Sequence, residues 1–351
     1  MMRKLFSLFL LSFSFVASAQ IGGSGTYEFL NLPVSARTAS LGGNIMSVKD
    51  DDINASFQNP SLLNPTMDNS LSLSYINYFA GINYGNAAYA KDFEKIGTFS
   101  LGMKFINYGT FTQADQTGQI TGTFKAAEYL FNIGYSKQLD SCFSIGANLK
   151  TIYSSLAQYA SFGNAIDLGG TYYNAKSKFS IAAVIANLGT QWKTYTPGNH
   201  EPLPLDVQIG ISKQPKHAPF RLSIIAQHLQ KWNLTYSDPS DTATIDPSTG
   251  QSITSSAPKW AFGDNLIRHL VLGGELLITK NFNLRLGFNY ERRKELELVT
   301  RTGLDGFSYG FGFKISKFQL SYGHAVYSLA GGSNHFTISL HLSEFMARKQ
   351  N

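Results

Sequence analysis

The titratable side chains of this sequence lie in a pattern that predicts neither a catalytic centre nor a metal site. Its seven histidines include no H-E-x-x-H pair, and no G-x-S-x-G motif presents a serine nucleophile. His335 and His341 share one face of a predicted strand, but six extended residues separate them by about 20 Å, too far for one metal ion. We expect Asp50 or Asp51 to cap a short helix that ends near Phe57, which explains the acidic run Asp50–Asp52. We therefore expect no catalytic residue, no metal and no cofactor.

The elements that carry these side chains are stretches in which apolar and polar residues alternate. Such alternation runs through residues 205–212, 282–290, 307–315 and 336–342. A period of two places one set of side chains on each face, as in a β-strand. About fourteen such segments, each about ten residues long with one apolar face, predict an all-β fold. That fold is a transmembrane antiparallel β-barrel with an apolar outside and a polar inside.

Residues 1–19 are typical of a secretory signal peptide. A basic start and a short apolar run precede Ala17-Ser18-Ala19, which provides an A-x-A cleavage site. No other segment has the about 18 consecutive apolar residues that a membrane-spanning helix needs. A soluble secreted β-sandwich would also show alternation, but 26 Phe, 18 Tyr and regularly spaced turns favour the barrel. We therefore predict a multi-pass β-barrel in the outer membrane, in contact with its lipid.

The connections between the predicted strands differ in length, and this predicts the orientation of the barrel. The long connections are 109–125, 189–203, 232–267 and 294–305. Outer-membrane barrels place long loops outside and short turns in the periplasm. Lysines lie in several short turns, as in 175–178, where anionic lipid headgroups explain them. Without the two basic residues of the leader, the 29 Lys and Arg and 23 Asp and Glu leave a mild net charge of 27 − 23 = +4. The aromatic residues follow the strand period, so we expect no nucleic-acid partner.

The segment between the leader and the first strand does not alternate and is rich in apolar residues. It contains Asn59-Pro60-Ser61, and Asn-Pro pairs favour turns. A fourteen-stranded barrel has room for a plug, so we predict that residues 20–69 form a folded hatch in the lumen. The predicted domains are thus the leader, this hatch, a barrel over 70–345 and a short tail over 346–351.

Several runs of this sequence resemble the PorQ family of the type IX secretion system. They are Tyr27–Asn44, Asp51–Leu63, Ser74–Phe93, Asn107–Tyr129, His200–Lys213 and Ala218–Tyr236. PorQ and its relative PorV are similar to the FadL family of fatty-acid transporters, which are fourteen-stranded barrels with an N-terminal hatch. Asn59, Pro60 and Ser61 correspond to the Asn-Pro-Ala element of such hatches, with serine in place of alanine.

The resemblance implies a non-catalytic membrane anchor for secreted cargo. In that system PorV receives cargo, PorU is the sortase and PorZ is a surface protein. We therefore expect a PorZ-like surface protein and the PorU/PorV attachment complex as partners. The alternatives are a FadL-like outer-membrane transporter of hydrophobic small molecules and a barrel enzyme that acts on lipid. A continuous apolar cavity would favour the transporter, and a Ser–His pair at the lipid interface would favour the enzyme.

The long polar connection from Trp232 to Arg268 is the candidate partner-docking loop. Trp232, Tyr236 and Trp260 are its aromatic anchors, because buried aromatic side chains carry much of the binding energy of interfaces. The alternative is a surface loop without a partner. The alternation also predicts that a charge is costly at the lipid-facing positions Leu286 and Ile209. The neighbouring lumen positions, Gly287 and Gln208, should tolerate it better.

Overall fold

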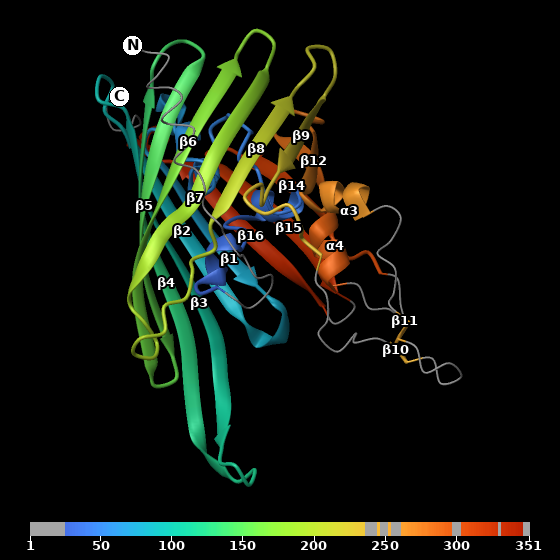
Figure 1. Ribbon diagram of the computed structural model, residues 1–351. Coiled ribbons are helices and arrows are strands. Elements are labelled where there is room, and N and C mark those ends of the chain that lie inside the picture. Colours follow the sequence, from blue (N-terminus) through green and yellow to red (C-terminus); the bar gives the residue numbers. More distant parts are fainter. Residues whose placement is uncertain are drawn as a thin grey trace, which may run out of the picture.

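The chain folds into a closed antiparallel β-barrel of fourteen strands, which confirms the predicted fold class (Figure 1). The computed structural model describes residues 25–235, 244–245, 252–253, 261–296, 303–328 and 331–346. Around the barrel, neighbours in sequence pair with each other, β9 pairs with β12, and β1 closes the barrel on β16. The barrel strands are β1 Ser70–Asn77, β2 Asn83–Asp92, β3 Thr98–Ala114, β4 Ile120–Gln138, β5 Phe143–Leu156, β6 Tyr159–Asn174, β7 Phe179–Lys193, β8 Asp206–Lys213, β9 Phe220–Ala226, β12 Leu270–Leu276, β13 Phe282–Asn289, β14 Phe307–Ile315, β15 Phe318–Ser328 and β16 Gly331–His341.

The two faces of each strand differ as the sequence pattern predicts. In β13, Leu286 is 68% exposed on the outer wall, whereas the preceding Arg285 is 2% exposed in the lumen. The same alternation recurs on the other strands, so the outside of the barrel is a band of Leu, Ile, Phe and Tyr. An apolar outer band with a polar interior is the arrangement that a barrel needs in lipid.

Several predicted boundaries are wrong. Strand β7, for example, continues to Lys193 into the expected loop 189–203, and local chemistry explains two others. The expected loop 109–125 is mostly strand, because β3 and β4 continue to pair until Ala114 meets Ile120 and Asp115 accepts backbone N–H bonds in the turn. This hairpin extends beyond the lower rim in Figure 1. Strand β13 ends at Asn289, and helix α4 (Tyr290–Leu296) follows. The Asn289 side chain accepts from the Arg292 N–H, and the residues of α4 are mostly good helix formers.

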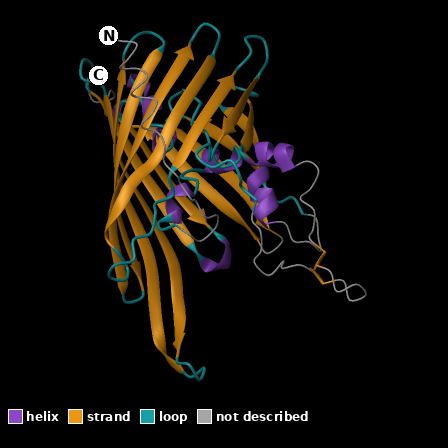
Figure 2. Cartoon of the chain, viewed as in Figure 1, coloured by secondary structure: helices purple, strands orange, loops and turns teal. Residues whose placement is uncertain are grey.

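The N-terminal segment, residues 25–69, lies inside the barrel. Its short helices contact opposite parts of the wall, since α2 touches β13 to β16 while η3 touches β4 to β6. Figure 2 shows these helices surrounded by strands. The helices are η1 Glu28–Asn31, α2 Ala36–Ser40, η2 Ile53–Phe57, η3 Pro60–Leu62 and η4 Pro65–Met67. That this segment acts as a movable hatch stays a prediction.

Close packing of the N-terminal segment depends on small residues in the wall. A Cβ at Gly287 would lie 2.1 Å from the backbone nitrogen of Gly42, so no larger residue fits there. A charged side chain at Gly287 would thus displace the N-terminal segment, which contradicts the expectation that Gly287 tolerates a charge better than Leu286. The predicted helix near Phe57 forms as η2, but its cap is Asp52, whose side chain accepts from the Asn54 N–H. Asp50 has another role, described below.

The remaining described elements lie outside the barrel sheet. They are η5 Phe79–Gly81, the paired strands β10 Thr244–Ile245 and β11 Ser252–Ile253, α3 Ala261–Arg268 and α5 Ser343–Met346. Within the described ranges, no helix is long and apolar enough to cross a membrane. The predicted signal peptide, residues 1–19, lies outside the described residues and stays a prediction.

Candidate functional site

A buried arginine–carboxylate cluster joins the N-terminal segment to the barrel wall. It consists of Arg37, Asp50 and Asp52 from the segment and Arg221, Glu275 and Arg285 from β9, β12 and β13. Arg37 lies in α2, whose first turn is capped by the hydroxyl of Ser35. The strand period places Glu275 and Arg285 opposite each other with their side chains in the lumen.

Arg37 occupies the centre of this cluster. Its Nε and Nη2 atoms donate to the two carboxylate oxygens of Glu275, each at 2.9 Å. Its Nη2 and Nη1 donate to the two oxygens of Asp50 at 2.7 and 3.1 Å. Burial would raise the pKa of Asp50, but Arg37 and Arg221 outweigh it and hold the pKa far below its usual range. The carboxylate of Asp50 is therefore ionised, and the two arginines compensate its charge.

Because the cluster has equal numbers of arginines and carboxylates, the loss of one member leaves an uncompensated buried charge. Such a loss typically costs about 3–5 kcal/mol. Four of its ion pairs connect the N-terminal segment to itself and to the wall at side chains that are at most one-fifth exposed. The cluster thus fixes the segment to one side of the lumen.

Asn59, Pro60 and Ser61 fix the opposite side of the segment to β5 and β6. Asn59 caps η3 by accepting from the Ser61 N–H, and its Nδ2 donates to the hydroxyl of Thr171 in β6. The Ser61 hydroxyl lies 2.7 Å from the same threonine oxygen. Gly146 of β5 makes room, since a Cβ there would lie 2.6 Å from Pro60. In this structure the three residues are thus a packing contact with the wall, and their role as a hatch motif stays a prediction.

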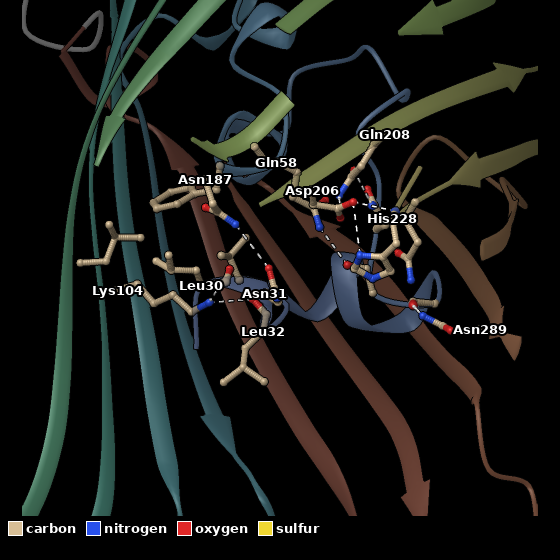
Figure 3. Close-up of a pocket in the computed structure, with 18 of the residues that line it drawn as sticks. Leu30, Asn31, Leu32, Gln58, Lys104, Asn187, Asp206, Gln208, His228 and Asn289 are labelled. Atoms are coloured by element: carbon tan, nitrogen blue, oxygen red, sulfur yellow. Dashed lines mark hydrogen bonds and ion pairs between the residues drawn. The ribbon is translucent and has the colours of Figure 1, made fainter. Parts of the chain in front are cut away.

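A lysine holds the start of the N-terminal segment. Lys104 of β3 is fully buried, and its Nζ donates to the backbone oxygens of Phe29 and Leu32 at 2.6 and 2.7 Å. Figure 3 shows this side chain reaching from the wall to the turn that carries Leu30 and Leu32. Lys104 thus adds a further polar attachment to those of Arg37 and Asn59. Hydrogen bonds from Lys49 to Ser144 and from Asn44 to Gln208 add others.

One internal cavity remains beside the N-terminal segment. Its volume is about 150 Å³, and both the segment and the wall line it (Figure 3). Leu30, Leu32 and Phe57 contribute apolar surface, whereas Asn187 and Gln208 are among several amide side chains. A dry apolar cavity of about this size can hold benzene, but polar walls of this kind also suit ordered water.

His228 connects the wall to helix α4 at the edge of this cavity. Its Nδ1 lies 3.3 Å from an oxygen of Asp206 at the start of β8, and its Nε2 lies 3.3 Å from an oxygen of Glu291 in α4. Burial lowers the pKa of His228, but hydrogen bonds to the two carboxylates outweigh it and raise the pKa to about 11. The imidazole is therefore charged at neutral pH, and its ion pair with Glu291 attaches α4 to the barrel wall.

The predicted docking residues are only partly described. Trp232 is 49% exposed, and its ring lies 5.1 Å from Phe262 of α3 and 5.6 Å from His269. Tyr236 and Trp260 lie outside the described residues. The structure thus places one of the three aromatics in an exposed patch, and its role in docking stays a prediction.

The sequence reasoning missed the arginine–carboxylate cluster, although part of its signal was readable. Glu275 and Arg285 occupy lumen positions on neighbouring strands, so opposite charges at paired positions pointed to an ion pair. Arg37 and Asp50 lie in irregular backbone, where no period assigns a facing partner. Within the described residues, no group of three or more His, Cys, Asp or Glu side chains is placed to hold a metal.

Comparison with known proteins supports the architecture. No family model matches this chain, and no curated protein is similar to it in sequence. The toluene transporter TodX of Pseudomonas putida is similar in fold, with a TM-score of 0.50 and 12% identity over 88% of this chain and 96% of TodX. A FadL homologue of Pseudomonas aeruginosa aligns with a TM-score of 0.45 and 11% identity over 88% and 97% of the two chains.

These findings define the class of protein and not its individual function. At 12% identity the likeness to TodX shows the fold alone, and that fold is a fourteen-stranded β-barrel of the outer-membrane type. The assignment to type IX secretion therefore rests on the sequence resemblance and stays a prediction.

Proposed function

We propose that this chain is an outer-membrane barrel that is closed at rest, so that it does not act as an open pore. The observation that carries this proposal is the arginine–carboxylate cluster, which binds residues 25–69 to β9 and β12. Any solute that crosses the lumen must displace a segment held by buried ion pairs. The lumen is therefore a gated or permanently filled space.

The finer function favoured by the comparisons is passage of a hydrophobic small molecule. TodX, which has the similar fold, is a toluene transporter. The cavity of about 150 Å³ beside Leu30, Leu32 and Phe57 is large enough for one small aromatic ring. On this proposal the N-terminal segment shifts to connect the cavity with the outside, and transport would be slow and selective.

The second candidate is the anchoring of a surface protein in cargo attachment. The sequence resemblance to the PorQ family supports it, and so does the polar lining of the cavity, which suits water better than a hydrocarbon. The exposed pair Trp232 and Phe262 offers an aromatic contact at the end of the barrel opposite the short turns. On this proposal the partner is a PorZ-like protein, and the lumen carries nothing.

A strain that lacks this chain separates the two candidates. The transport proposal expects slower uptake of a radiolabelled hydrophobic tracer such as toluene, with surface proteins retained at normal levels. The anchoring proposal expects normal uptake, with secreted cargo released into the medium. If neither uptake nor cargo retention changes, both finer functions are wrong, although the closed barrel stands.

Shortening the loop between Thr235 and Ala261 tests the docking part of the second candidate. The barrel should still assemble, because the described parts of the loop lie outside the fourteen-stranded sheet. We expect the surface partner to be lost from affinity purifications of the barrel. A partner that is recovered at the normal level would show that this loop is not the docking site.

A further inference from the structure

A groove on the outer wall near the short turns lies apart from the lumen and its cluster. Its volume is about 450 Å³, and it runs over β5, β6 and β7. Apolar side chains form most of its walls: Leu139, Phe143, Ile145, Tyr172 and Ile181. These residues belong to the exposed apolar band, so the groove opens toward lipid.

The pairing of the strands explains why the wall is hollow at this point. One row across the sheet reads Ile145, Gly170, Ala183 and Ile209, all on the outer face. Two large residues thus flank two small ones, and a Cβ at Gly170 would meet nothing within 4 Å. The row nearer the short turns, from Phe143 to Tyr172 and Ile181, is bulky again. The depression is therefore bounded at the membrane surface by large side chains.

Three lysines lie near this groove, one on the strand beside it and two in the turn at its end. Lys137 of β4 is the cross-strand neighbour of Ile145, and Lys176 and Lys178 lie in the turn that joins β6 to β7. All three are exposed, and none makes an ion pair with a described residue. One carboxylate, Asp140, lines the groove, but it already accepts the backbone N–H bonds of Cys142 and Phe143. The local charge is therefore positive.

We propose that this groove binds one anionic phospholipid of the periplasmic leaflet. An acyl chain would lie over Gly170 and Ala183, and the phosphate would lie among Lys137, Lys176 and Lys178. The short turns place this end of the barrel at the periplasmic surface of the membrane. The leaflet on that side is made of phospholipid. Each lysine near a membrane surface favours an anionic lipid by about 1 kcal/mol, which is about fivefold in affinity.

The apolar groove and the lysines near it are continuous with the lipid-facing band of the barrel. We therefore propose lipid as the ligand. A protein partner or a second copy of the chain would need a matching ridge, and the positive rim of the groove would face equally positive lysines of a second copy. An acyl chain is flexible enough to fill a depression only two residues wide, and its headgroup supplies the opposite charge.

Photo-cross-linking of the full barrel tests the proposal. The barrel is reconstituted in nanodiscs that contain a phosphatidylglycerol with a diazirine on one acyl chain, and labelled peptides are mapped by mass spectrometry. We expect labelling within residues 139–183, with unlabelled phosphatidylglycerol competing at least fivefold better than phosphatidylcholine. The variant Gly170→Leu should remove this labelling. The matched variant Gly274→Leu, at a position of β12 on another part of the wall where a Cβ would make only ordinary van der Waals contacts, should keep it.

A second variant tests the contact between the lysines and the lipid headgroup. Replacing Lys137, Lys176 and Lys178 by Gln should bring competition by phosphatidylglycerol and phosphatidylcholine to within about twofold of each other. Equal competition in the unmodified barrel, or labelling that Gly170→Leu leaves unchanged, would overturn the proposal. A dimer of the barrel that dissociates only in Gly170→Leu would also overturn it, because a second copy would then occupy the groove.

Discussion

At the scale of single residues, the burial and pairing of charges decide which side chains contribute most to the stability of the fold. Arg37 makes ion pairs with three carboxylates while only 7% of its side chain is exposed. By contrast, Lys91 and Asp68 form a pair at 3.1 Å with side chains that are 40% and 35% exposed. Water screens the second pair but not the first, so the two should respond very differently to mutation.

Replacing Arg37 by Leu should therefore lower the free energy of unfolding by about 3–5 kcal/mol, because Glu275 and Asp50 lose a buried partner. Replacing Lys91 by Gln should cost at most about 1 kcal/mol. Urea unfolding of the two variants in vesicles measures both values. Equal losses would contradict the account of the cluster.

His228 gives a prediction about pH. Its ordinary pKa of 6.5 is raised to about 11, so its charged form is favoured in the folded state. Its contribution to stability is fully present below pH 6.5 and is lost as the pH rises through about 11. Carbon-13 NMR of labelled histidine should show this imidazole charged from pH 6 to 9. The variant His228→Gln identifies the resonance, and a titration midpoint near 6.5 would refute the ion pairs.

At the scale of elements, the strand period allowed most of the fold to be predicted from the sequence. Alternation identified fourteen strands because the two faces of each strand meet different solvents, lipid and lumen. It failed at α4, where good helix formers directly follow β13, and in the β3–β4 hairpin, which continues beyond the band. In the N-terminal segment, short helices pack against the wall, and the sequence there shows no period from which their contacts could be predicted.

The assignment of outer and inner faces can be tested on one strand. Ile209 is 48% exposed on the outer wall of β8, and its neighbour Gln208 lines the cavity. Replacing Ile209 by Arg should lower the free energy of unfolding, because the charge enters the lipid-facing band, where the cost rises with depth toward about 2–4 kcal/mol at the midplane. Replacing Gln208 by Arg should cost clearly less, because the lumen there is polar. Refolding into lipid vesicles, followed by urea titration, compares them, and the reverse order would contradict the assignment.

At the scale of the whole molecule, polar contacts attach residues 25–69 to several parts of the barrel wall. The arginine–carboxylate cluster holds one side of residues 25–69, Asn59 and Ser61 hold the opposite side, and Lys104 holds the beginning. The sequence predicted that a segment of this size would fill the lumen. It could not predict the ion pairs that fix it, because these join residues far apart in the chain.

Single-channel recording in planar lipid bilayers tests the closed state most directly. The complete mature barrel should show no steady conductance, because residues 25–69 fill the lumen and the ion pairs of Arg37 hold them there. A variant that lacks residues 25–65 should conduct as a stable open pore, provided that it still folds as a heat-modifiable barrel. A complete barrel that conducts freely, at the level of its truncated variant, would contradict the account.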